Sequence, residues 1–416
     1  MELPDRCAEL SPTYTLDEAL SHILTSIKPM AETEEVSLKE ALGRVLAVTL
    51  DAPLDLPPFP NSAMDGYALR HADIAEHQDN MLTVIGASFA GKPYTAKVGA
   101  GECVRIFTGA AIPEGADTVI MQENVVRDDK HARLTGTVNA QANVRLAGDE
   151  IRQGECLLER GRVLHAADLG LLASAGFTKA TVTRRLKLAY FSTGDELRPV
   201  DEPLDYGQIH DSNRYLIHGL TQHPAIESID MGIVPDTATA VKNALLEASQ
   251  QADAVISTGG VSVGDADFVT TTLAELGQVN FWKVAIKPGK PFAFGRIGEA
   301  WFFGLPGNPV AVMVTFRQLV RPALHQLMGI PVRPSFRLMA VCRSTLKKSP
   351  GRIEFQRGFF ESDGAGGFFV TGSTMQGSHQ LLGMSRANCY LVLSKENAGV
   401  RPGDWVEIEP FPDLLA

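Results

Sequence analysis

The sequence predicts a multidomain α/β plus β protein. A central α/β domain with a mostly parallel sheet is combined with an inserted small β domain, a C-terminal β domain and a discontinuous N-terminal α+β domain. Three observations predict this. The 416 residues exceed what one hydrophobic core normally serves. Strand and helix patterns alternate between about residues 186 and 328, as is typical of a parallel sheet covered by helices. Short β-rich runs separated by Gly and Pro turns come before and after that stretch.

Composition and charge limit the partners of the chain. The hydrophobic fraction of 44% is ordinary for a globular protein. A formal net charge of -11 argues against nucleic acid or an anionic membrane surface as the main partner. No apolar run approaches the roughly 18 residues of a membrane span. Five scattered cysteines without a C-x-x-C pair argue against a disulfide framework or structural zinc, so we expect a cytoplasmic protein.

Two short helices are predicted at the start of the chain, in residues 1–52. Capping-box patterns begin at Thr15 and at Ser37, and apolar residues at helical spacing follow the first. Gly43 is suited to the left-handed position after the second helix. A strand and a helix predicted within residues 144–184 are expected to rejoin this segment as one discontinuous linker and dimerisation domain.

A small β domain is predicted for residues 53–143. Four prolines between 53 and 60 impose an extended path that suits a crossing between domains. Strand-like runs then occur at 82–85, 103–107 and 118–121. The run GASFAGK at 86–92 matches the start of a phosphate-loop pattern, but Pro93 stands where that pattern needs a hydroxyl residue, so we reject it.

Strands and helices alternate in residues 185–331, the predicted α/β domain. Strands are expected at 186–191, 229–234, 254–257, 292–294 and 301–303, and helices at 211–222, 237–248, 268–276 and 310–328. Asn308 is a possible cap of the last helix, with Pro309 in its first turn. Residues 332–416 return to short strands with glycine turns and are predicted to form the C-terminal β domain.

Glycines, acids and lysines gather in residues 256–316. Gly259 and Gly260 follow a buried-looking strand and can take left-handed angles that let backbone N–H groups approach an anion. Lys283, Lys287 and Lys290 lie within eight residues and can each act as a point charge on an oxyanion. Asp265 and Asp267 could hold a hard cation such as Mg²⁺. This pattern predicts an anion site outside the carboxyl ends of the strands.

Each of these features has a structural alternative. An isolated Gly-Gly is more often a tight turn, and a single lysine is more often a solvated charge. Asp236 follows Pro235 and could serve as a helix cap. Asp65 precedes Gly66 and is by default a turn residue. Pro306 and Pro309 fix the shape of a loop. The combination of neighbouring acids and lysines favours a ligand site.

Six motifs together resemble one family over nearly the whole chain. They are NSAMDGYA at 61–68, RIFTGA at 105–110, STGDE at 192–196, STGGVSVG at 257–264, KVAIKPGKPF at 283–292 and GLPGNP at 304–309. They resemble the MoeA-type molybdopterin molybdenumtransferases and the gephyrin E-domain. The resemblance implies Mg²⁺-assisted insertion of molybdate into adenylylated molybdopterin with release of AMP. It also implies an elongated homodimer whose cleft lies between the α/β domain of one subunit and the small β domain of the other.

The resemblance assigns candidate roles to particular residues. Glu196, Asp236 and Asp267 would be the carboxylates at the strand ends, for catalysis and for the metal, with the catalytic Lys283 and Lys287 on the anionic ligand and Asp65 opposite them. The substrate-binding candidates are Thr108, Gly259, Gly260, Ser262, Lys290, Pro306, Pro309, Glu150, Arg357 and Ser378, of which Arg357 and Ser378 would hold molybdate. The chain departs from the family where bacterial members read Gly-Glu-Asp, because it has Gly148, Asp149 and Glu150. Either acid could serve the site.

Two other functions remain open at this stage. A molybdopterin adenylyltransferase shares the Thr-Gly-Asp-Glu and Thr-Gly-Gly signals, but such enzymes are typically a single domain. A non-catalytic scaffold of the gephyrin E-domain type is the alternative from another class. The additional β domains and the Pro-Gly-Asn-Pro segment favour the insertion enzyme, for which the adenylyltransferase that supplies the substrate is a candidate partner.

Overall fold

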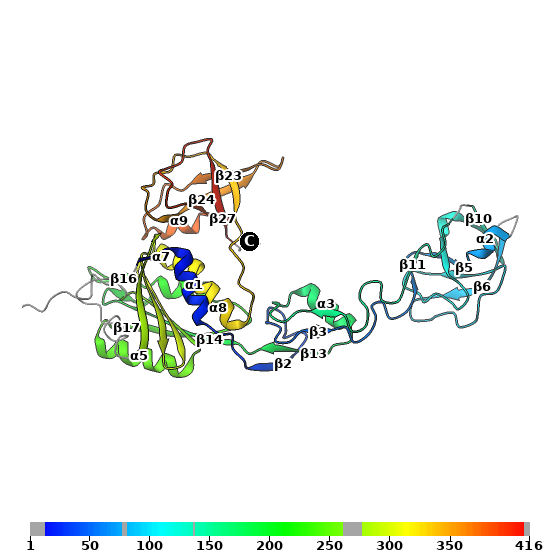
Figure 1. The fold of residues 1–416 in the computed structure, drawn as a ribbon, viewed down its shortest axis with the longest axis horizontal. Helices are drawn as coiled ribbons and strands as arrows, with labels where there is room; N and C mark the ends of the chain where they lie inside the picture. The colour runs from blue at the N-terminus through cyan, green and yellow to red at the C-terminus, as the bar shows by residue number, and fades with distance from the viewer. Residues whose placement is uncertain (1–12, 77–80, 136–137, 261–276, 412–416) are drawn as a thin grey trace, which may run out of the picture.

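A computed structural model describes residues 13–76, 81–135, 138–260 and 277–411. The molecule is elongated, with the α/β domain and the C-terminal β domain at one end and the small β domain at the other (Figure 1). A narrow domain built from both sides of the small β domain in sequence lies between them. Among the described helices, none combines the length and the apolar character that a membrane crossing requires. The fold is therefore the predicted multidomain α/β plus β architecture.

The α/β domain is built on a seven-stranded sheet with strand order β1-β19-β21-β22-β18-β14-β17. Its strands are β1 (Thr13–Tyr14), β14 (Leu186–Thr193), β17 (Ile226–Val234), β18 (Ala254–Thr258), β19 (Gly277–Val284), β21 (Pro291–Ile297) and β22 (Ala300–Leu305). Four of the six neighbouring pairs are parallel, and only β21 runs antiparallel to both of its neighbours. The sheet is mostly parallel, as predicted.

Helices cover both faces of this sheet. The larger apolar core joins one face to α1 (Leu16–Ser26), α4 (Asn213–Leu220), α7 (Pro309–Thr315) and α8 (Arg321–Met328). The smaller core joins the other face to α5 (Ala238–Gln251). The helix predicted at 310–328 is a continuous helical run, in which the π-helical turn η2 (Phe316–Val320) separates α7 from α8. The helix predicted at 268–276 lies outside the described residues.

The first helix belongs to the α/β domain, which corrects the predicted grouping of residues 1–52. α1 begins at the predicted capping box, in which Thr15 and Glu18 bond reciprocally. Its buried residue Ile23 lies in the larger core, and β1 pairs with β19. The sequence pattern reveals an apolar helix face but not which domain covers it, because that depends on contacts between distant segments.

Residues 38–43 form a turn, so the second predicted helix is wrong. The predicted capping contact exists, since the Ser37 hydroxyl donates to Glu40 Oε2 at 2.7 Å. However, β2 (Thr33–Ser37) is held extended by antiparallel pairing with β13 (Lys179–Thr183). Gly43 has the expected left-handed φ of 71°, and its N–H bonds to the carbonyl oxygen of Leu164. The pairing of β2 with β13 therefore leaves a turn where the capping-box pattern predicts a helix.

The rest of the N-terminal domain joins the two chain segments that flank the small β domain. β3 (Leu50–Asp51) pairs with β12 (Cys156–Leu158), and α3 (Ala166–Ser174) follows. In the first turn of α3, the Asp168 carboxylate accepts a bond from the backbone N–H of His165 at 2.8 Å. This domain therefore has its own small core.

The small β domain contains a six-stranded sheet with strand order β8-β5-β7-β6-β10-β9. Its strands are β5 (Gly66–Leu69), β6 (Met81–Ser88), β7 (Glu102–Ile106), β8 (Thr118–Met121), β9 (Val125–Arg127) and β10 (His131–Leu134), accompanied by α2 (Ala72–Glu76) and the 3-10 turn η1 (Gln122–Asn124). β4 (Asn61–Ser62) pairs with β11 (Val144–Arg145) where the chain enters and leaves. The predicted strand runs are confirmed.

The C-terminal β domain is joined to the α/β domain by a strand pair. Its strands are β23 (Leu338–Cys342), β24 (Ile353–Ser362), β25 (Phe368–Gly372), β26 (Cys389–Leu393) and β27 (Trp405–Pro410), with the short helix α9 (Leu381–Ser385). β20 (Ile286–Lys287) comes from the α/β domain and pairs in parallel with β24, so that Lys287 is in register with Glu354. This pairing brings the predicted lysine segment against the last domain.

Candidate active site

A cavity of about 970 Å³ lies between the strand ends of the α/β domain and the C-terminal β domain. It opens at the carboxyl ends of β14, β18 and β22, where α/β proteins bind ligands. Nine of the residues predicted from the sequence line it, namely Glu196, Asp236, Gly259, Gly260, Lys287, Lys290, Pro306, Pro309 and Ser378. The structure therefore brings together residues that are spread between positions 196 and 378 of the chain.

The two glycines after β18 form the floor of the cavity. Gly259 and Gly260 have φ values of 88° and 65°, in the left-handed region that glycine adopts at little cost. A Cβ atom on Gly259 would lie 2.3 Å from the carbonyl oxygen of Thr193, at the end of the neighbouring strand β14. Only glycine lets these two strand ends approach so closely. The residue therefore forms a tight turn and also leaves the space above it open to the cavity.

Glu196 and Asp236 line the cavity, and Asp195 lies next to them in contact with the Asp236 backbone. Asp236 accepts a bond from the Thr193 hydroxyl at 3.3 Å, and its own N–H donates to Asp195 at 3.2 Å. Partial burial, together with the charges of Asp195 and Glu196, raises the pKa of Asp236 above its usual value, and the bond from Thr193 only partly offsets this. The helix-cap alternative for Asp236 is not needed, because Thr237 is the N-cap of α5.

The carboxylates of Glu196 and Asp236 suit a hard cation. Carboxylate oxygens are the ligands that Mg²⁺ prefers, and the repulsion that raises the pKa of Asp236 is the kind of charge excess a cation relieves. Among the described residues, no three His, Cys, Asp or Glu side chains are close enough to form a complete metal site. Asp265 and Asp267, which were predicted to contribute, lie outside the described residues, as does Ser262.

Basic residues also line the cavity. Lys287 and Lys290 are exposed in the cavity, and Arg352 contributes a further positive charge. Gly289 lies between the two lysines with a φ of 111°, and a Cβ atom there would be 2.6 Å from the Thr315 methyl group. The glycine thus lets the lysine segment rest directly on α7. Lys283 lies on β19 in register with Thr13 and is not among the cavity residues.

A loop of the C-terminal domain covers the start of α7. The N–H of Val310, in the first turn of α7, donates to the carbonyl oxygen of Ser378 at 3.1 Å. Arg357 is fully buried behind this loop and donates to the carbonyl oxygens of Met375 at 3.0 Å and Gly377 at 3.2 Å. Arg357 was expected to hold molybdate, but its guanidinium supports the loop that carries Ser378 and does not line the cavity.

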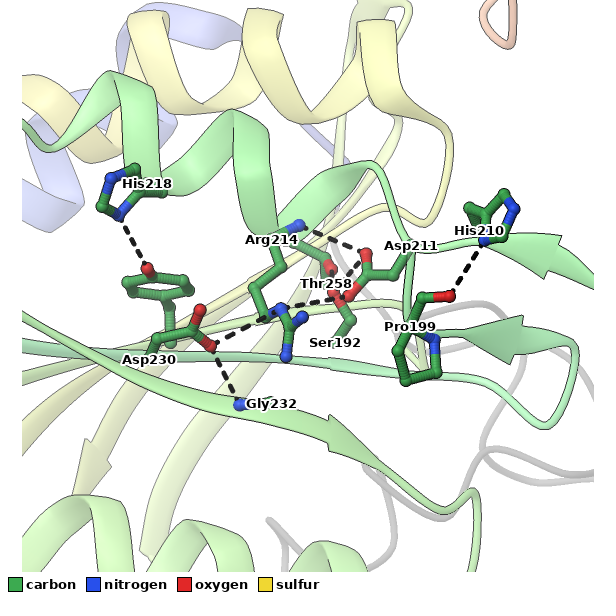
Figure 2. Close-up of polar contacts among 10 residues, drawn as sticks. Ser192, Pro199, His210, Asp211, Arg214, His218, Asp230, Gly232 and Thr258 are labelled. Atoms are coloured by element: carbon green, nitrogen blue, oxygen red, sulfur yellow. Dashed lines mark hydrogen bonds and ion pairs between the residues drawn. The ribbon is translucent and has the colours of Figure 1, made fainter. Parts of the chain in front are cut away.

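A buried polar network lies beneath the strand ends (Figure 2). The Ser192 hydroxyl donates to Asp211 Oδ1 at 3.0 Å and lies 2.9 Å from the Thr258 hydroxyl. Asp211 is 1% exposed and also accepts a bond from the backbone N–H of Arg214, while the Arg214 guanidinium lies between Asp211 and Asp230. The network ties the ends of β14 and β18 to the start of α4. It fixes the strand ends from which the cavity residues extend.

Asn213 anchors the Pro-Gly-Asn-Pro loop to the same helix. Its side-chain amide donates to the carbonyl oxygen of Gly307 at 2.7 Å, and the residue is buried. Pro306 and Pro309 flank this contact. Asn308 occupies the N-cap position of α7, as the sequence suggested, although its side chain makes no capping bond. The cavity rim is therefore held from α4.

The remaining predicted residues lie away from the cavity. Asp65 Oδ1 accepts bonds from both the backbone N–H and the hydroxyl of Thr108, each at 2.8 Å, and these two bonds lower the pKa of Asp65. This pair belongs to the small β domain, at the other end of the molecule in Figure 1. Asp149 accepts a bond from the N–H of Leu146 within a local turn, while Glu150 is exposed next to it.

The cavity residues that the sequence analysis missed include Arg352, Glu354, Gln376 and His379. Glu354 lies 3.2 Å from Lys287 and is 6% exposed. A buried acid in a predicted strand is a weak signal, because the sequence does not show which lysine it meets. The pairing of β20 with β24 is needed to find it.

Models of known protein families match three segments of the chain, which together include the domains described above. Family models match residues 14–176, described as the MoeA N-terminal region (domain I and II), residues 189–326, described as "Probable molybdopterin binding domain", and residues 339–411, described as the MoeA C-terminal region (domain IV). Together they span most of the chain and each of its domains.

Relatives match along nearly the whole length. The molybdopterin molybdenumtransferase of Haemophilus influenzae is 44% identical over 405 residues, covering 96% of this chain and 99% of the relative. That of a Nostoc species is 35% identical and covers 94% of this chain and 92% of the relative. A crystal structure of the molybdopterin biosynthesis MoeA protein of Pyrococcus horikoshii is 29% identical, with a TM-score of 0.84 over 96% of this chain and all of that one. The chain belongs to the MoeA family of molybdopterin molybdenumtransferases.

Proposed function

We propose that the strand-end cavity inserts molybdate into adenylylated molybdopterin and releases AMP and the finished molybdenum cofactor. The observation that carries this proposal is that acidic and basic side chains line the same cavity. Carboxylates of Glu196 and Asp236 and the cationic side chains of Lys287, Lys290 and Arg352 share one volume large enough for a nucleotide. Such a site can hold two anionic substrates and a cation together.

The chemistry requires a phosphoric anhydride to be cleaved. Water forms a bond to phosphorus while the bond from that phosphorus to the bridging oxygen of AMP breaks, and AMP leaves with that oxygen as the proton of the water passes to solvent. Lys287 and Lys290 would bind the phosphate oxygens and neutralise their charge. Asp236 would help to orient the attacking water. When bound at Glu196 and Asp236, Mg²⁺ would further neutralise the phosphate. No covalent enzyme intermediate is required.

Molybdate would enter beside the loop that carries Ser378. The Ser378 side chain is partly exposed to the cavity and can donate to an oxyanion. Arg357 would act through this loop, because its guanidinium is committed to the carbonyl oxygens of Met375 and Gly377. We therefore assign Arg357 a positioning role.

We also propose that the working unit is a homodimer with shared sites. Asp65 and Thr108 lie in the small β domain, far along the molecule from the cavity of their own chain (Figure 1). They can reach a cavity of this kind only if it belongs to a second subunit. Substrate would arrive from an enzyme that adenylylates molybdopterin.

The test is a turnover assay with purified protein, adenylylated molybdopterin, molybdate and Mg²⁺. Release of AMP in step with the appearance of active molybdenum cofactor supports insertion. Net formation of the adenylate from ATP and molybdopterin would instead support an adenylyltransferase. Absence of any turnover, for protein whose circular dichroism spectrum shows a folded chain, would favour a non-catalytic binding role.

A further inference from the structure

A second cavity, of about 750 Å³, lies between the N-terminal domain and the end of the α/β domain. One wall consists of residues 156–165, from β12 to the start of α3. The other consists of α8 and residues 330–335, which lead into the C-terminal domain. We refer to this cavity as the arginine groove, because Arg160, Arg162, Arg321 and Arg333 all line it. It shares no residue with the strand-end cavity.

The two walls touch, so the groove is formed before any ligand binds. Gly161 has a φ of 84°, and a Cβ atom there would lie 2.6 Å from the carbonyl oxygen of Gly329 and 3.1 Å from Pro331. Gly329 caps α8 in the left-handed conformation, and the next N–H, that of Ile330, bonds to the carbonyl oxygen of His325 at 2.9 Å. Glycine at both contact points keeps the walls in place. Preformed sites bind with a smaller ordering cost.

The charge of the groove is opposite to that of the whole chain. The protein carries a formal net charge of -11. Four guanidinium groups nevertheless line this cavity, against the single carboxylate of Glu159. Like charges gathered in a cavity repel one another, and an anion bound among them relieves that repulsion. Guanidinium groups also match phosphate oxygens with paired N–H donors.

One of the arginines is already fixed in position. Asp168 is 3% exposed, and its Oδ1 accepts a hydrogen bond from Nε of Arg162 at 2.8 Å and forms an ion pair with Nη2 at 2.8 Å. The Arg162 side chain is 50% exposed, so N–H donors of its guanidinium remain open to solvent. Arg162 is thus oriented from behind while part of its surface faces solvent. This is how a binding arginine is commonly preorganised.

His325 contributes no positive charge to the groove at pH 7. Burial lowers the pKa of His325 to about 4, and the charges of Arg321 and His223 act in the same direction. Burial also lowers the pKa of His223, with a further contribution from His165. The His325 imidazole is therefore neutral at pH 7, and the positive charge of the groove comes from its arginines.

We propose that the arginine groove is a second anion site, which binds a small, multiply charged phosphate compound between the N-terminal domain and α8. The chemistry fits inorganic pyrophosphate and the phosphate chain of a nucleotide equally, because both present clustered phosphate oxygens. Binding there stabilises the junction at which Gly161 meets Gly329. This inference is independent of the function proposed for the strand-end cavity.

Calorimetric titration of the full-length protein with sodium pyrophosphate, at 150 mM salt and without magnesium, tests the proposal. The Lys287→Ala variant serves as the parent, because its strand-end cavity lacks one phosphate-binding charge. We expect saturable binding to this parent. Arg160 and Arg333 are both exposed. Adding Arg160→Gln and Arg333→Gln to the parent should raise the Kd for pyrophosphate at least about tenfold, which corresponds to the loss of one charge-assisted hydrogen bond. Adding Arg133→Gln and Lys130→Gln, which are exposed in the small β domain, should leave binding unchanged.

Parallel titrations with AMP and ATP distinguish the sources of the phosphate. Tighter binding of pyrophosphate than of ATP to the parent indicates a site for the free oxyanion, and the reverse order indicates a nucleotide. The proposal is overturned if the parent shows no saturable binding, or if the Arg160 and Arg333 changes leave its affinity unaltered while circular dichroism shows intact folding. A single Arg333→Gln change provides the same comparison should the combined variant fail to fold.

Discussion

Lys287 Nζ lies 3.2 Å from Glu354 Oε1, and this ion pair joins the α/β domain to the C-terminal β domain inside the strand-end cavity. The lysine side chain is 52% exposed, whereas the glutamate side chain is 9% exposed and also accepts a bond from Gln356. The two residues are in register in the parallel pair of β20 with β24. The strand pairing therefore sets both the width of the cavity and the position of its lysine.

Replacing Lys287 by Ala should abolish most turnover and leave the fold nearly unchanged. Loss of one charge that stabilises the reacting phosphate is expected to reduce turnover by about 10²- to 10³-fold. An ion pair with a half-exposed lysine contributes at most about 1 kcal/mol to the free energy of unfolding. Steady-state assays and urea unfolding would measure the two effects. Lys130→Ala in the small β domain is the control, and a large loss of stability specific to Lys287→Ala would assign it a structural role.

Asp236→Asn should make the protein more stable at pH 7 and inactive. The folded protein raises the pKa of Asp236 above the ordinary value of 3.8. A carboxyl group with a raised folded pKa stabilises the fold only while protonated, so that contribution is lost as the pH rises through the folded value. Asn does not ionise, so the Asp236→Asn variant does not lose this stability as the pH rises. The difference in thermal midpoint should therefore be largest at neutral pH and vanish as the pH falls below the ordinary carboxyl value.

Asp363 is a suitable control because the fold shifts its pKa in the opposite direction to that of Asp236. Backbone N–H groups of Ala365 and Gly367 bond to its carboxylate and lower its pKa. Its ionised form stabilises the fold above the ordinary carboxyl pKa, and this is lost as the pH falls through the lowered value. Asp363→Asn should thus reduce the thermal midpoint at pH 7 and keep activity. Equal shifts of the same sign in both variants would refute the electrostatic account of Asp236.

Asn213→Ala should loosen the Pro-Gly-Asn-Pro loop. The change removes the 2.7 Å bond to the carbonyl oxygen of Gly307 and leaves that group without its side-chain partner. We expect a loss of about 1–3 kcal/mol in the free energy of unfolding. KM for the pterin nucleotide should rise more than kcat falls, because the loop positions substrate. Gln222→Ala, an exposed change beyond the far end of α4, is the matched control. An unchanged KM would separate this loop from substrate binding.

The organisation of the α/β domain could be predicted from sequence because its signals are local. A Cβ atom at position 259 would lie 2.3 Å from the carbonyl oxygen at the end of the neighbouring strand, so only glycine fits there. The glycine can therefore be recognised from the sequence as a mark of the site. The capping box at Thr15 and Glu18 likewise fixes the start of α1. The capping box depends on residues three apart, and the glycine is marked by its residue type although its neighbour Thr193 is distant in sequence. They can be recognised without knowing the fold.

The features that could not be predicted depend on distant partners. The contact of Lys287 with Glu354 requires β20, a two-residue strand with no periodicity to detect. Arg357 is chemically suited to an oxyanion, but burial commits it to backbone carbonyl groups. Ser37 carries a helix-start pattern that pairing with β13 overrides. In each case tertiary contacts outweigh a correct local tendency.

Mixing two inactive variants should restore activity if sites are shared between subunits. Asp65→Ala disables the small β domain of its chain, and Lys287→Ala disables the cavity. Random exchange makes about half of the dimers mixed, each with one intact site of two, so about one quarter of wild-type activity should return. The assay is turnover after subunit exchange, with each variant alone as the control. No recovery, despite exchange shown by mass spectrometry, would contradict a site to which one subunit contributes Asp65 and the other Lys287.

The central claim is that the strand-end cavity holds molybdate beside the pterin nucleotide. Anomalous X-ray diffraction at the molybdenum absorption edge, from crystals grown with AMP, Mg²⁺ and molybdate, locates the metal directly. We expect a molybdenum peak within the cavity, in contact with Ser378 or Lys287. A molybdenum peak at full occupancy elsewhere, with this cavity lacking one, would contradict it.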